Sequence, residues 1–277
     1  MGGKRQLLPA LSHFIPDRIE RYREPFVGGG AVFFHLRERP ETLRSAVLSD
    51  INEELVNAYR VVQSDVDSLI VALQEHKARH DKDYYYTVRA QPYSSGVPGA
   101  ARTIYLNKTG YNGLYRVNRS GQFNVPFGRY KNPSIVDPEQ LRRASNALRD
   151  AQIDVKCFRE AINTAVAGDF LYLDPPYVPL SATANFTSYL PGGFGSKDQE
   201  DLAECLRNAS KRGVQFVLSN SYTDEVQRLY KGFHIHCVPA TRRINCDGSK
   251  RGTVDEAIVC NFELPVNGLA SDSKEAA

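Results

Sequence analysis

The sequence predicts an α/β protein whose main sheet is interrupted by an inserted, mainly helical lobe. Short apolar runs alternate with helical patterns up to about Val62, and the alternation resumes after Ala151. Between them, residues 63–150 hold few apolar runs suited to a buried parallel strand. We therefore expect a discontinuous main domain of residues 1–62 and 151–265, an inserted lobe of residues 63–150, and a flexible, mostly polar tail of residues 266–277.

Composition limits the kind of protein. A chain of 277 residues is long enough for one large α/β domain with a smaller lobe, and its formal net charge of +3 is modest. No apolar run approaches the ~20 residues that span a bilayer, and residues 1–5 do not resemble a signal peptide. The five cysteines are scattered and form neither a disulfide framework nor a zinc pattern. We expect a cytoplasmic protein with reduced thiols and no membrane partner.

The first expected binding element is the glycine-rich segment EPFVGGG at residues 24–30, which leads into a helix. Glycine permits positive φ and close approach of a ligand, and the first amides of a helix are free donors. Asp50 ends the next apolar run, roughly 20 residues on, where nucleotide-binding units place an acid that accepts ribose hydroxyls. The full dinucleotide fingerprint is missing, which favours a ligand with a ribose and without a pyrophosphate. A flexible loop is the alternative.

The middle stretch carries the clearest pattern of a nucleic-acid partner. A helical pattern formed by Val66, Leu69, Ile70 and Leu73 precedes two segments, residues 108–119 and 127–131, in which cations alternate with aromatic rings and amides. Arg pairs with guanine, Asn with adenine and Lys with phosphate, while aromatic rings stack on bases. The alternative is a solvated charged loop with a hairpin turn at Asn112-Gly113.

After residue 151, the apolar run of residues 170–173 predicts a buried strand that ends in Asp174-Pro175-Pro176-Tyr177. Ligands of open α/β sheets bind beyond the carboxyl ends of the strands, and the two prolines force the chain out of the sheet there. The alternative is an ordinary strand end followed by a proline loop.

Two further elements follow in the chain. A helix over residues 197–211 is expected to begin with a capping box formed by Ser196 and Gln199 and to end at Gly213. A second buried strand is expected over residues 214–218.

Taken together, these features resemble the Dam-type DNA adenine-N6 methyltransferases, and the resemblance covers nearly the whole chain. It rests on Gly2-Gly3-Lys4, on the glycine segment, and on residues 49–52, 111–114, 121–130 and 174–189. It implies a Rossmann-like, S-adenosylmethionine-dependent methyltransferase sheet with an inserted DNA-recognition lobe. One departure is the Lys-Trp-Ala or similar tripeptide that usually precedes Gly-Gly-Lys. Here Met1 stands in its place and the chain has no tryptophan, so either the start is set late or this contact is dispensed with.

The resemblance implies a role for individual residues. The residues implied in binding S-adenosylmethionine are Lys4, Glu24, Phe26, Gly28, Gly30, Asp50, Phe158 and Asp174. Those implied in binding double-stranded DNA at GATC are Tyr111, Asn112, Leu114, Arg116, Pro126, Tyr130, Lys131, Tyr177 and Phe186, with Arg116 reading the outer guanine and Tyr130 and Lys131 on the backbone. The catalytic residues are Asp174, Pro175, Pro176 and Tyr177.

The expected chemistry explains these residue types. The exocyclic amine of adenine is a poor nucleophile because its lone pair is delocalised into the ring. The Asp174 carboxylate and the Pro175 carbonyl would accept its two hydrogens, favour tetrahedral nitrogen and stabilise the developing positive charge. The target adenine must first leave the duplex, so Tyr177 would restore one stacking face, and Phe186 the other or a cover for the pocket.

Alternatives to adenine methylation remain open at this point. The same motif would serve an enzyme that methylates cytosine N4 or an RNA base, and a catalytically idle DNA-binding regulator would retain the binding residues. The carboxylates are not grouped as a two-metal nuclease requires, so we expect no metal. We expect a monomer, whether the enzyme serves restriction-modification, repair marking or a phage.

Overall fold

The computed structural model describes residues 4–39, 41–118, 120–178, 193–241 and 253–264, and within them it forms one sheet of seven strands. In chain order the strands are β1 (Ile19–Glu24), β2 (Leu43–Asp50), β3 (Ala151–Val155), β4 (Asp169–Leu173), β5 (Gln215–Ser221), β6 (His234–Thr241) and β7 (Thr253–Cys260). Their order across the sheet is β3-β2-β1-β4-β5-β7-β6. The predicted α/β class is confirmed.

The topology fixes where a ligand can bind. Strands β1 to β5 are parallel, whereas β7 is antiparallel to both of its neighbours, β5 and β6. β1 pairs with β2 on one side and with β4 on the other, so the strand order reverses between β1 and β4. In open α/β sheets, ligands bind at the carboxyl ends of the strands beside such a switch point.

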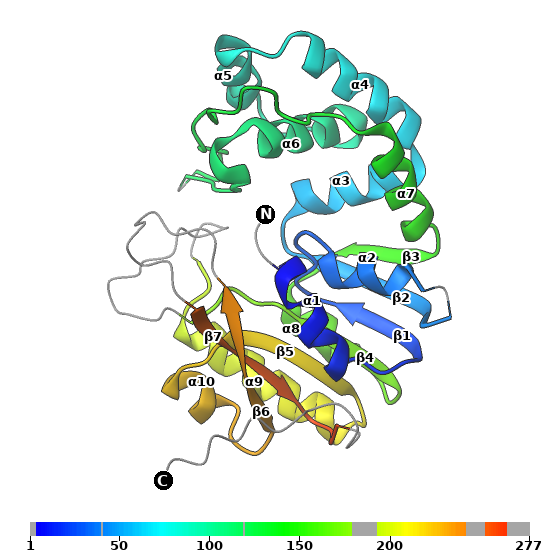
Figure 1. Cartoon of the computed structure of the whole chain (residues 1–277), viewed down its shortest axis with the longest axis vertical. Helices are drawn as coiled ribbons and strands as arrows, with labels where there is room; N and C mark the ends of the chain where they lie inside the picture. Colours follow the sequence, from blue (N-terminus) through cyan, green and yellow to red (C-terminus); the bar gives the residue numbers. More distant parts are fainter. Residues whose placement is uncertain (1–3, 40, 119, 179–192, 242–252, 265–277) are drawn as a thin grey trace.

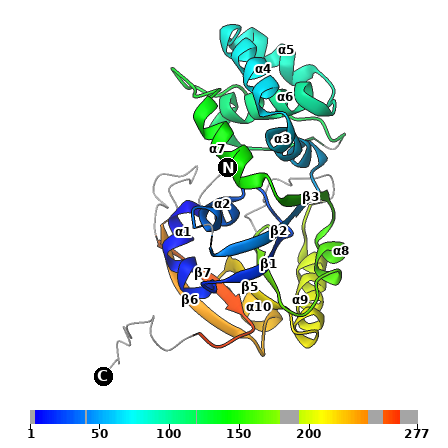
Figure 2. The same cartoon turned by 90° about the vertical axis from the view of Figure 1, so that its right-hand side faces the viewer.

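Helices cover both faces of the sheet. α1 (Lys4–Leu11) and α2 (Ala31–Arg37) lie on one face, and α8 (Phe158–Asn163) and α9 (Ser196–Lys211) lie on the other (Figure 2). Strand β4 shows the reason, because all five of its residues are buried. Phe170 and Tyr172 pack in the apolar cluster that contains α1 and α2, while Leu171 and Leu173 pack in the cluster that contains α8 and α9. This alternation is the period of two that a strand buried on both faces requires.

A helical body lies beyond one end of the sheet, between β2 and β3 in the chain (Figure 1). Its helices are α3 (Glu53–Ser64), α4 (Val66–Ala78), α5 (Lys82–Ala90), α6 (Gly96–Thr109) and α7 (Pro138–Leu148). α3 contacts β2 and β3 as well as α6 and α7, and so joins the body to the sheet. Asn52, Asp81 and Asp137 cap α3, α5 and α7 through side-chain oxygens that accept backbone N–H groups. No helix in the described ranges is long and apolar enough to cross a membrane.

The remaining described elements are short. They are the 3₁₀ turns η1 (Ser12–Phe14) and η2 (Tyr111–Gly113) and the helix α10 (Asp224–Leu229). The predicted capping box of Ser196 and Gln199 is wrong. At the start of α9 the backbone N–H of Gly195 donates to the Asp198 carboxylate instead, and the Gln199 side chain is buried and takes no part in the cap. The helix stop at Gly213 is confirmed by its φ of +80°. The predicted tail of residues 266–277 lies outside the described residues.

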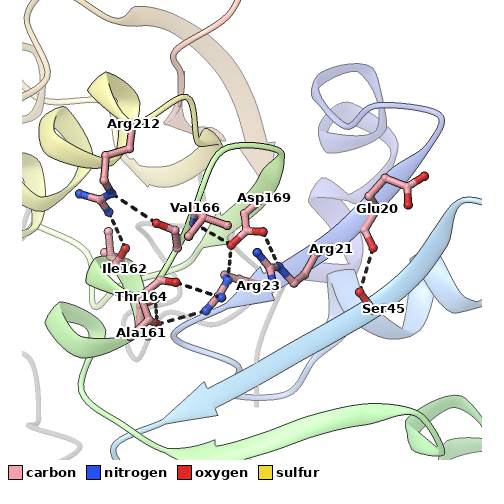
Figure 3. Close-up of polar contacts among 11 residues, drawn as sticks. Glu20, Arg21, Arg23, Ser45, Ala161, Ile162, Thr164, Val166, Asp169 and Arg212 are labelled. Atoms are coloured by element: carbon pink, nitrogen blue, oxygen red, sulfur yellow. Dashed lines mark hydrogen bonds and ion pairs between the residues drawn. The ribbon is translucent and has the colours of Figure 1, made fainter.

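An ion-pair cluster fixes the amino-terminal edge of the sheet (Figure 3). Asp169 opens β4 and is 1% exposed. Its two carboxylate oxygens accept the Nε–H groups of Arg21 and Arg23 from β1, the latter at 2.6 Å, and Val166 adds a backbone N–H at 3.1 Å. Every oxygen of the buried carboxylate is therefore satisfied, as burial of a charge demands.

Arg23 of this cluster and a further arginine, Arg212, together cap helix α8 at its carboxyl end (Figure 3). Arg23 donates to the carbonyl of Thr164 at 3.2 Å, and Arg212 donates to the carbonyl of Ile162 at 2.9 Å. Cations near the last carbonyls of a helix satisfy acceptors that have no partner within the helix. A helix of only six residues is thereby held in place, and its first residue, Phe158, takes part in the site described next.

Candidate active site

Three carboxylates meet at the carboxyl edge of the sheet. Glu24 ends β1, Asp50 ends β2, and Asp174 follows the last residue of β4. These strands are neighbours in the order β2-β1-β4, so parallel pairing brings the three side chains to one edge. Asp174 and Asp50 act electrostatically on Glu24, in keeping with this proximity. The edge therefore favours a positively charged ligand.

Glu24 is the most deeply buried of the three, with 2% exposure. Burial, with a smaller contribution from the negative charges of Asp174 and Asp50, raises the pKa of its carboxyl to about 8. Hydrogen bonds from the Tyr22 hydroxyl, at 2.9 Å, and from the backbone N–H of Phe33 act in the opposite direction. Glu24 is thus a carboxyl whose ionisation would be favoured by a cation bound beside it.

Asp50 is held by the loop that follows β1. Its two oxygens accept the backbone N–H groups of Gly28, at 3.2 Å, and of Asn52, at 3.0 Å. Burial raises the pKa of Asp50, and these hydrogen bonds oppose the rise. Each carboxylate oxygen has a second lone pair, so an oriented Asp50 can still accept a hydroxyl hydrogen from a ligand.

The glycine segment is a tight turn rather than an open loop. Gly28 and Gly30 have φ values of +46° and +62°, which favour glycine. The Tyr59 hydroxyl of α3 donates to the Gly28 carbonyl at 3.1 Å. A Cβ on Gly30 would lie 2.6 Å from that hydroxyl oxygen and 3.2 Å from the Phe34 ring. Tyr59 thus fixes the turn, and its place in an ordinary helical pattern gave no signal of this in the sequence.

Asp174 is oriented by the neighbouring strand β5. The Ser219 hydroxyl donates to its Oδ1 at 3.2 Å and also lies 3.2 Å from the Tyr172 hydroxyl oxygen. Because the serine has one hydrogen to give, Tyr172 acts as the donor to Ser219 when Ser219 donates to Asp174. The half-exposed carboxylate of Asp174 is therefore oriented by two buried, hydrogen-bonded hydroxyl groups, those of Ser219 and Tyr172.

Two buried amide side chains hold the proline loop after Asp174. Gln199 donates to the Pro176 carbonyl at 2.7 Å, and the Asn220 side-chain oxygen accepts the backbone N–H of Val178 at 3.0 Å. Asn220 also donates to Gln199 at 3.2 Å, which links the two amides. Because consecutive prolines have no N–H groups, the loop depends on such side-chain contacts, and Pro175 is itself buried.

The aromatic residue of the motif is anchored at its far end. The Tyr177 hydroxyl donates to Glu256 of β7 at 2.6 Å, and the ring is half-buried. Phe186, the second ring predicted to cover the base, lies outside the described residues.

A cluster of phenylalanines lies beside the glycine turn. Phe26 stacks on Phe158 with ring centroids 5.5 Å apart, Phe194 packs against both rings, and the Arg159 guanidinium lies 4.5 Å from the centroid of Phe158. Phe158 is only 6% exposed, so it forms part of the wall rather than an open surface.

Two apolar side chains near Asp50 are exposed although they adjoin this edge. Ile51 follows Asp50 and is 52% exposed, and Val155, which is paired with Asp50 in the sheet, is 42% exposed. Neither residue was assigned a role from the sequence, although an apolar residue directly after the strand-end acid was a usable signal. Lys4 begins α1, but its side chain lies outside the described part of the structure.

Seven of the residues predicted to bind DNA lie in one segment, residues 111–131, which follows α6 in the helical body (Figure 1). Tyr111, Leu114 and Tyr130 are 44%, 40% and 44% exposed. Asn112 is exposed with a φ of +54°, and the remaining exposed residues of this set are Pro126 and Lys131. The segment is joined to α5 by Tyr85 and Arg89, which both donate to the Val125 carbonyl.

Arg116 lies on a short hairpin within this segment. Its Nε and Nη2 donate to the side-chain and backbone oxygens of Asn124 at 2.7 and 3.0 Å. Next to its turn, the hairpin is closed by the Asn118 N–H, which donates to the Gln122 carbonyl at 2.8 Å. The turn suggested at Asn112-Gly113 is instead the 3₁₀ turn η2. Asn124, which fixes the guanidinium, was not anticipated from the sequence.

An open sheet in this order, with a glycine turn and three carboxylates at its switch point, defines a nucleotide-cofactor protein of the α/β class. Comparison with known proteins gives the family. The model of the D12 class of N6 adenine-specific DNA methyltransferases matches residues 1–244. The chain belongs to this family.

Individual relatives agree with the family. The chain is 42% identical to the Type II methyltransferase M1.LlaDCHI of Lactococcus lactis, over 94% of this chain and 93% of the relative. It is 42% identical to the Type II methyltransferase M.MjaIII of Methanocaldococcus jannaschii, over 94% and 96%. It is 35% identical to the DNA adenine methylase of Escherichia coli K12, over 99% and 96%. The predicted family and enzyme class, an adenine-specific DNA methyltransferase, are confirmed. Membership implies DNA as the substrate and S-adenosylmethionine as the methyl donor.

Proposed function

We propose that this protein transfers a methyl group from S-adenosylmethionine to N6 of adenine within GATC, after the adenine has been rotated out of the duplex. The observation that carries the proposal is the pair formed by the carboxylate edge and the loop after β4. Asp174 is aimed by Ser219, and its loop is fixed by Gln199 and Asn220. Preorganised acceptors of this kind are what amine methylation needs.

The residues at the edge suit the proposed cofactor. S-adenosylmethionine supplies a methyl group on a positively charged sulfur, and it also carries a ribose and a cationic amine. Asp50, Asp174 and Glu24 lie together at this edge, and a cation bound there would favour ionisation of Glu24. Asp50 would accept the ribose hydroxyls and Asp174 would face the methionine amine.

Other residues would complete the cofactor site. Gly28 and the Phe26–Phe158 pair would line the cofactor beside the exposed side chains of Ile51 and Val155. Lys4 would lie near the entrance.

Asp174 and Pro175 would act on the target amine. The Asp174 carboxylate and the Pro175 carbonyl would accept its two hydrogens and turn the nitrogen lone pair out of conjugation. They would also stabilise the positive charge that forms as the nitrogen–carbon bond is made and the bond from the methyl carbon to sulfur breaks, with its electron pair remaining on the sulfur. The proton would then pass from the methylated nitrogen to water, so Asp174 need not be a strong base. Pro176 keeps the loop outside the sheet, and Tyr177 would stack on the extruded base, with Phe186 as the proposed second ring.

The segment from residue 111 to 131 would recognise the duplex. Tyr111 and Asn112 would enter it near the target, while Leu114, Arg116 and Pro126 would contact the flanking bases, with Arg116 on the outer guanine. The exposure of Tyr111 and Leu114 supports this role, because large apolar side chains left in water commonly mark binding surfaces. Tyr130 and Lys131 would contact the DNA backbone.

The organisation of the chain follows from this assignment. Residues 63–150 would form the target-recognition lobe, residues 1–62 and 151–265 the catalytic domain, and the protein would act as a monomer in the cytoplasm. A palindrome offers one adenine on each strand, so two turnovers by one monomer complete the site.

The deciding experiment is methyl transfer from labelled S-adenosylmethionine to two duplexes that differ only in whether they contain GATC. N6-methyladenine in the GATC duplex alone supports reaction, base and site together. Label in both duplexes contradicts GATC reading but leaves the enzyme class. N4-methylcytosine, or label only in RNA, contradicts the proposed acceptor, and cofactor binding without label on any nucleic acid would favour an idle regulator.

A variant tests the proposed base reader. Arg116→Ala should relax preference at the outer guanine by about ten- to a hundredfold, because a bidentate arginine–guanine pair contributes about 1 to 3 kcal/mol. Arg143→Ala is the matched control, since this arginine is 71% exposed on α7 and pairs only weakly, at 3.7 Å, with Glu139. Uniform weakening on all sequences would identify Arg116 as a phosphate contact instead.

A further inference from the structure

The last strand of the sheet brings one more carboxylate to the candidate site. β7 runs antiparallel to β5, and the register pairs Glu256 with Ser221, the last residue of β5. β5 is parallel to β4 and ends at the same edge, so Glu256 lies beside the loop that follows β4. Reversal of this one strand thus places a residue far along the chain next to Tyr177.

The contact between the two residues is short and largely removed from water. Glu256 is 8% exposed, and its Oε2 accepts the Tyr177 hydroxyl at 2.6 Å. An O–H···O⁻ bond of this length is typical of a charge-assisted interaction, which is stronger than a bond between neutral groups. A carboxylate so deeply placed also requires donors of this kind.

The hydroxyl anchor complements a backbone that is already fixed. On either side of Tyr177, the Pro176 carbonyl is held by Gln199 and the Val178 N–H by Asn220. A tyrosine side chain has two rotatable bonds. Fixing the backbone at one end and the hydroxyl oxygen at the other fixes the long axis of the ring, and because a phenolic O–H prefers to lie in the ring plane, the bond to Glu256 also favours one rotation about that axis. A stacking platform needs that placement, since a base stacks only on a ring face at a suitable place and angle.

We propose that Glu256 is a positioning residue that holds the Tyr177 ring in the orientation required to stack on the extruded adenine. The proposal rests on the proposed function, in which Tyr177 provides that stacking face. In this account Glu256 touches neither base nor cofactor, and it acts on stacking through the tyrosine hydroxyl.

A double-mutant cycle tests the proposal. Glu256→Gln keeps the shape of the side chain but removes its charge, Tyr177→Phe removes only the hydroxyl, and the double variant removes both the charge and the hydroxyl. The single-turnover rate of methyl transfer is measured at saturating cofactor, and base extrusion is followed by the fluorescence of 2-aminopurine at the target position. Cofactor affinity and the urea midpoint are measured alongside, with Glu263→Gln, an exposed carboxyl beyond β7, as the matched control.

Each single variant should lose about tenfold or more in rate, as loss of a charge-assisted hydrogen bond would bring, with cofactor affinity unchanged. The double variant should be no slower than the slower single variant, because all three lack the charge-assisted bond. The proposal would be overturned if the rate losses of the two single variants multiplied in the double variant. It would also be overturned if both single variants stayed within twofold of the parent rate, or if base extrusion were unchanged. Should Glu256→Gln fail to fold, Tyr177→Phe alone decides by the same rate and fluorescence. A parent that methylates no DNA would instead refute the proposed function, and the positioning role with it.

Discussion

Replacing Glu24 by glutamine tests the electrostatics of the carboxylate edge. The substitution keeps the shape of the side chain and an oxygen that can accept from Tyr22 and Phe33, but it removes the ionisation. In the folded protein the carboxyl has a pKa of about 8, against an ordinary value of 4.5. Between these values the folded state holds a proton that the unfolded state has released, so the stability of the parent falls as pH rises, by ~1.4 kcal/mol per pH unit.

The size of the effect follows from the same values. The stability that the protonated carboxyl contributes is fully present below about pH 4.5 and is lost as pH rises to about 8. Over the whole window the loss is at most about 5 kcal/mol, and relaxation of the protein or entry of water would reduce it. The glutamine variant has no such dependence, so it should be more stable than the parent by a margin that widens toward pH 8.

The assay is urea unfolding of cofactor-free parent and variant at several pH values from about 5 to about 8, the window set by the pKa of Glu24. Glu139→Gln is the control, because this carboxyl is 86% exposed, its ion-pair partner is an arginine, and the margin should therefore stay flat across the window. A margin for Glu24→Gln that is equally flat would refute the reasoning, since the carboxyl would then be ionised in the folded protein as it is in the unfolded chain.

The remaining predictions concern the loop, the amino-terminal edge and the glycine turn. Asp174→Ala should lower methyl transfer by about a hundred- to a thousandfold while duplex binding in a gel shift is retained, and turnover within about tenfold of the parent would contradict its role. Asp169→Ala should lower the free energy of unfolding in urea by about 2 to 3 kcal/mol, a value reduced because one of its arginine partners is 40% exposed, and a loss near zero would count against the ion-pair cluster. Gly30→Ala should destabilise the protein by about 1 to 3 kcal/mol, and by more than Gly168→Ala, which has a similar positive φ but open space around it. Equal losses would show that the close tyrosine hydroxyl simply moves aside.

The sequence predicted site residues best at positions where only one physical reason explains the residue type, such as an acid at a strand end or a glycine in a tight turn. Strand ends bearing Asp50 and Asp174 could be predicted because apolar runs stop at them, and parallel strands bring their ends to one edge. The glycines of the turn could be predicted because positive φ and close packing both exclude a side chain. The family could be predicted because long segments in a fixed order are specific, and the comparisons confirm it.

The contacts that aim these groups could not be predicted. Ser219, Gln199 and Asn220 lie on a neighbouring strand and helix, and their relation to the loop depends on sheet order and on side-chain rotamers. Gln199 shows the difficulty, because its spacing from Ser196 fits a helix cap while the folded protein uses its amide on the Pro176 carbonyl. Local spacing cannot reveal a partner that only tertiary structure supplies.

The carboxylate edge also predicts that affinity for the cofactor depends on pH. Parallel pairing forces the ends of β1, β2 and β4 together, so Glu24 is protonated only because burial and two nearby carboxyls oppose its charge. A cation bound at the edge removes that opposition and favours release of the proton. Affinity for S-adenosylmethionine should therefore rise as pH increases from about 6 to about 8, and the rise should vanish in Glu24→Gln. Binding measured by calorimetry in buffers of different ionisation enthalpy would detect the released proton, and equal heats in all buffers would show that the cofactor leaves Glu24 neutral.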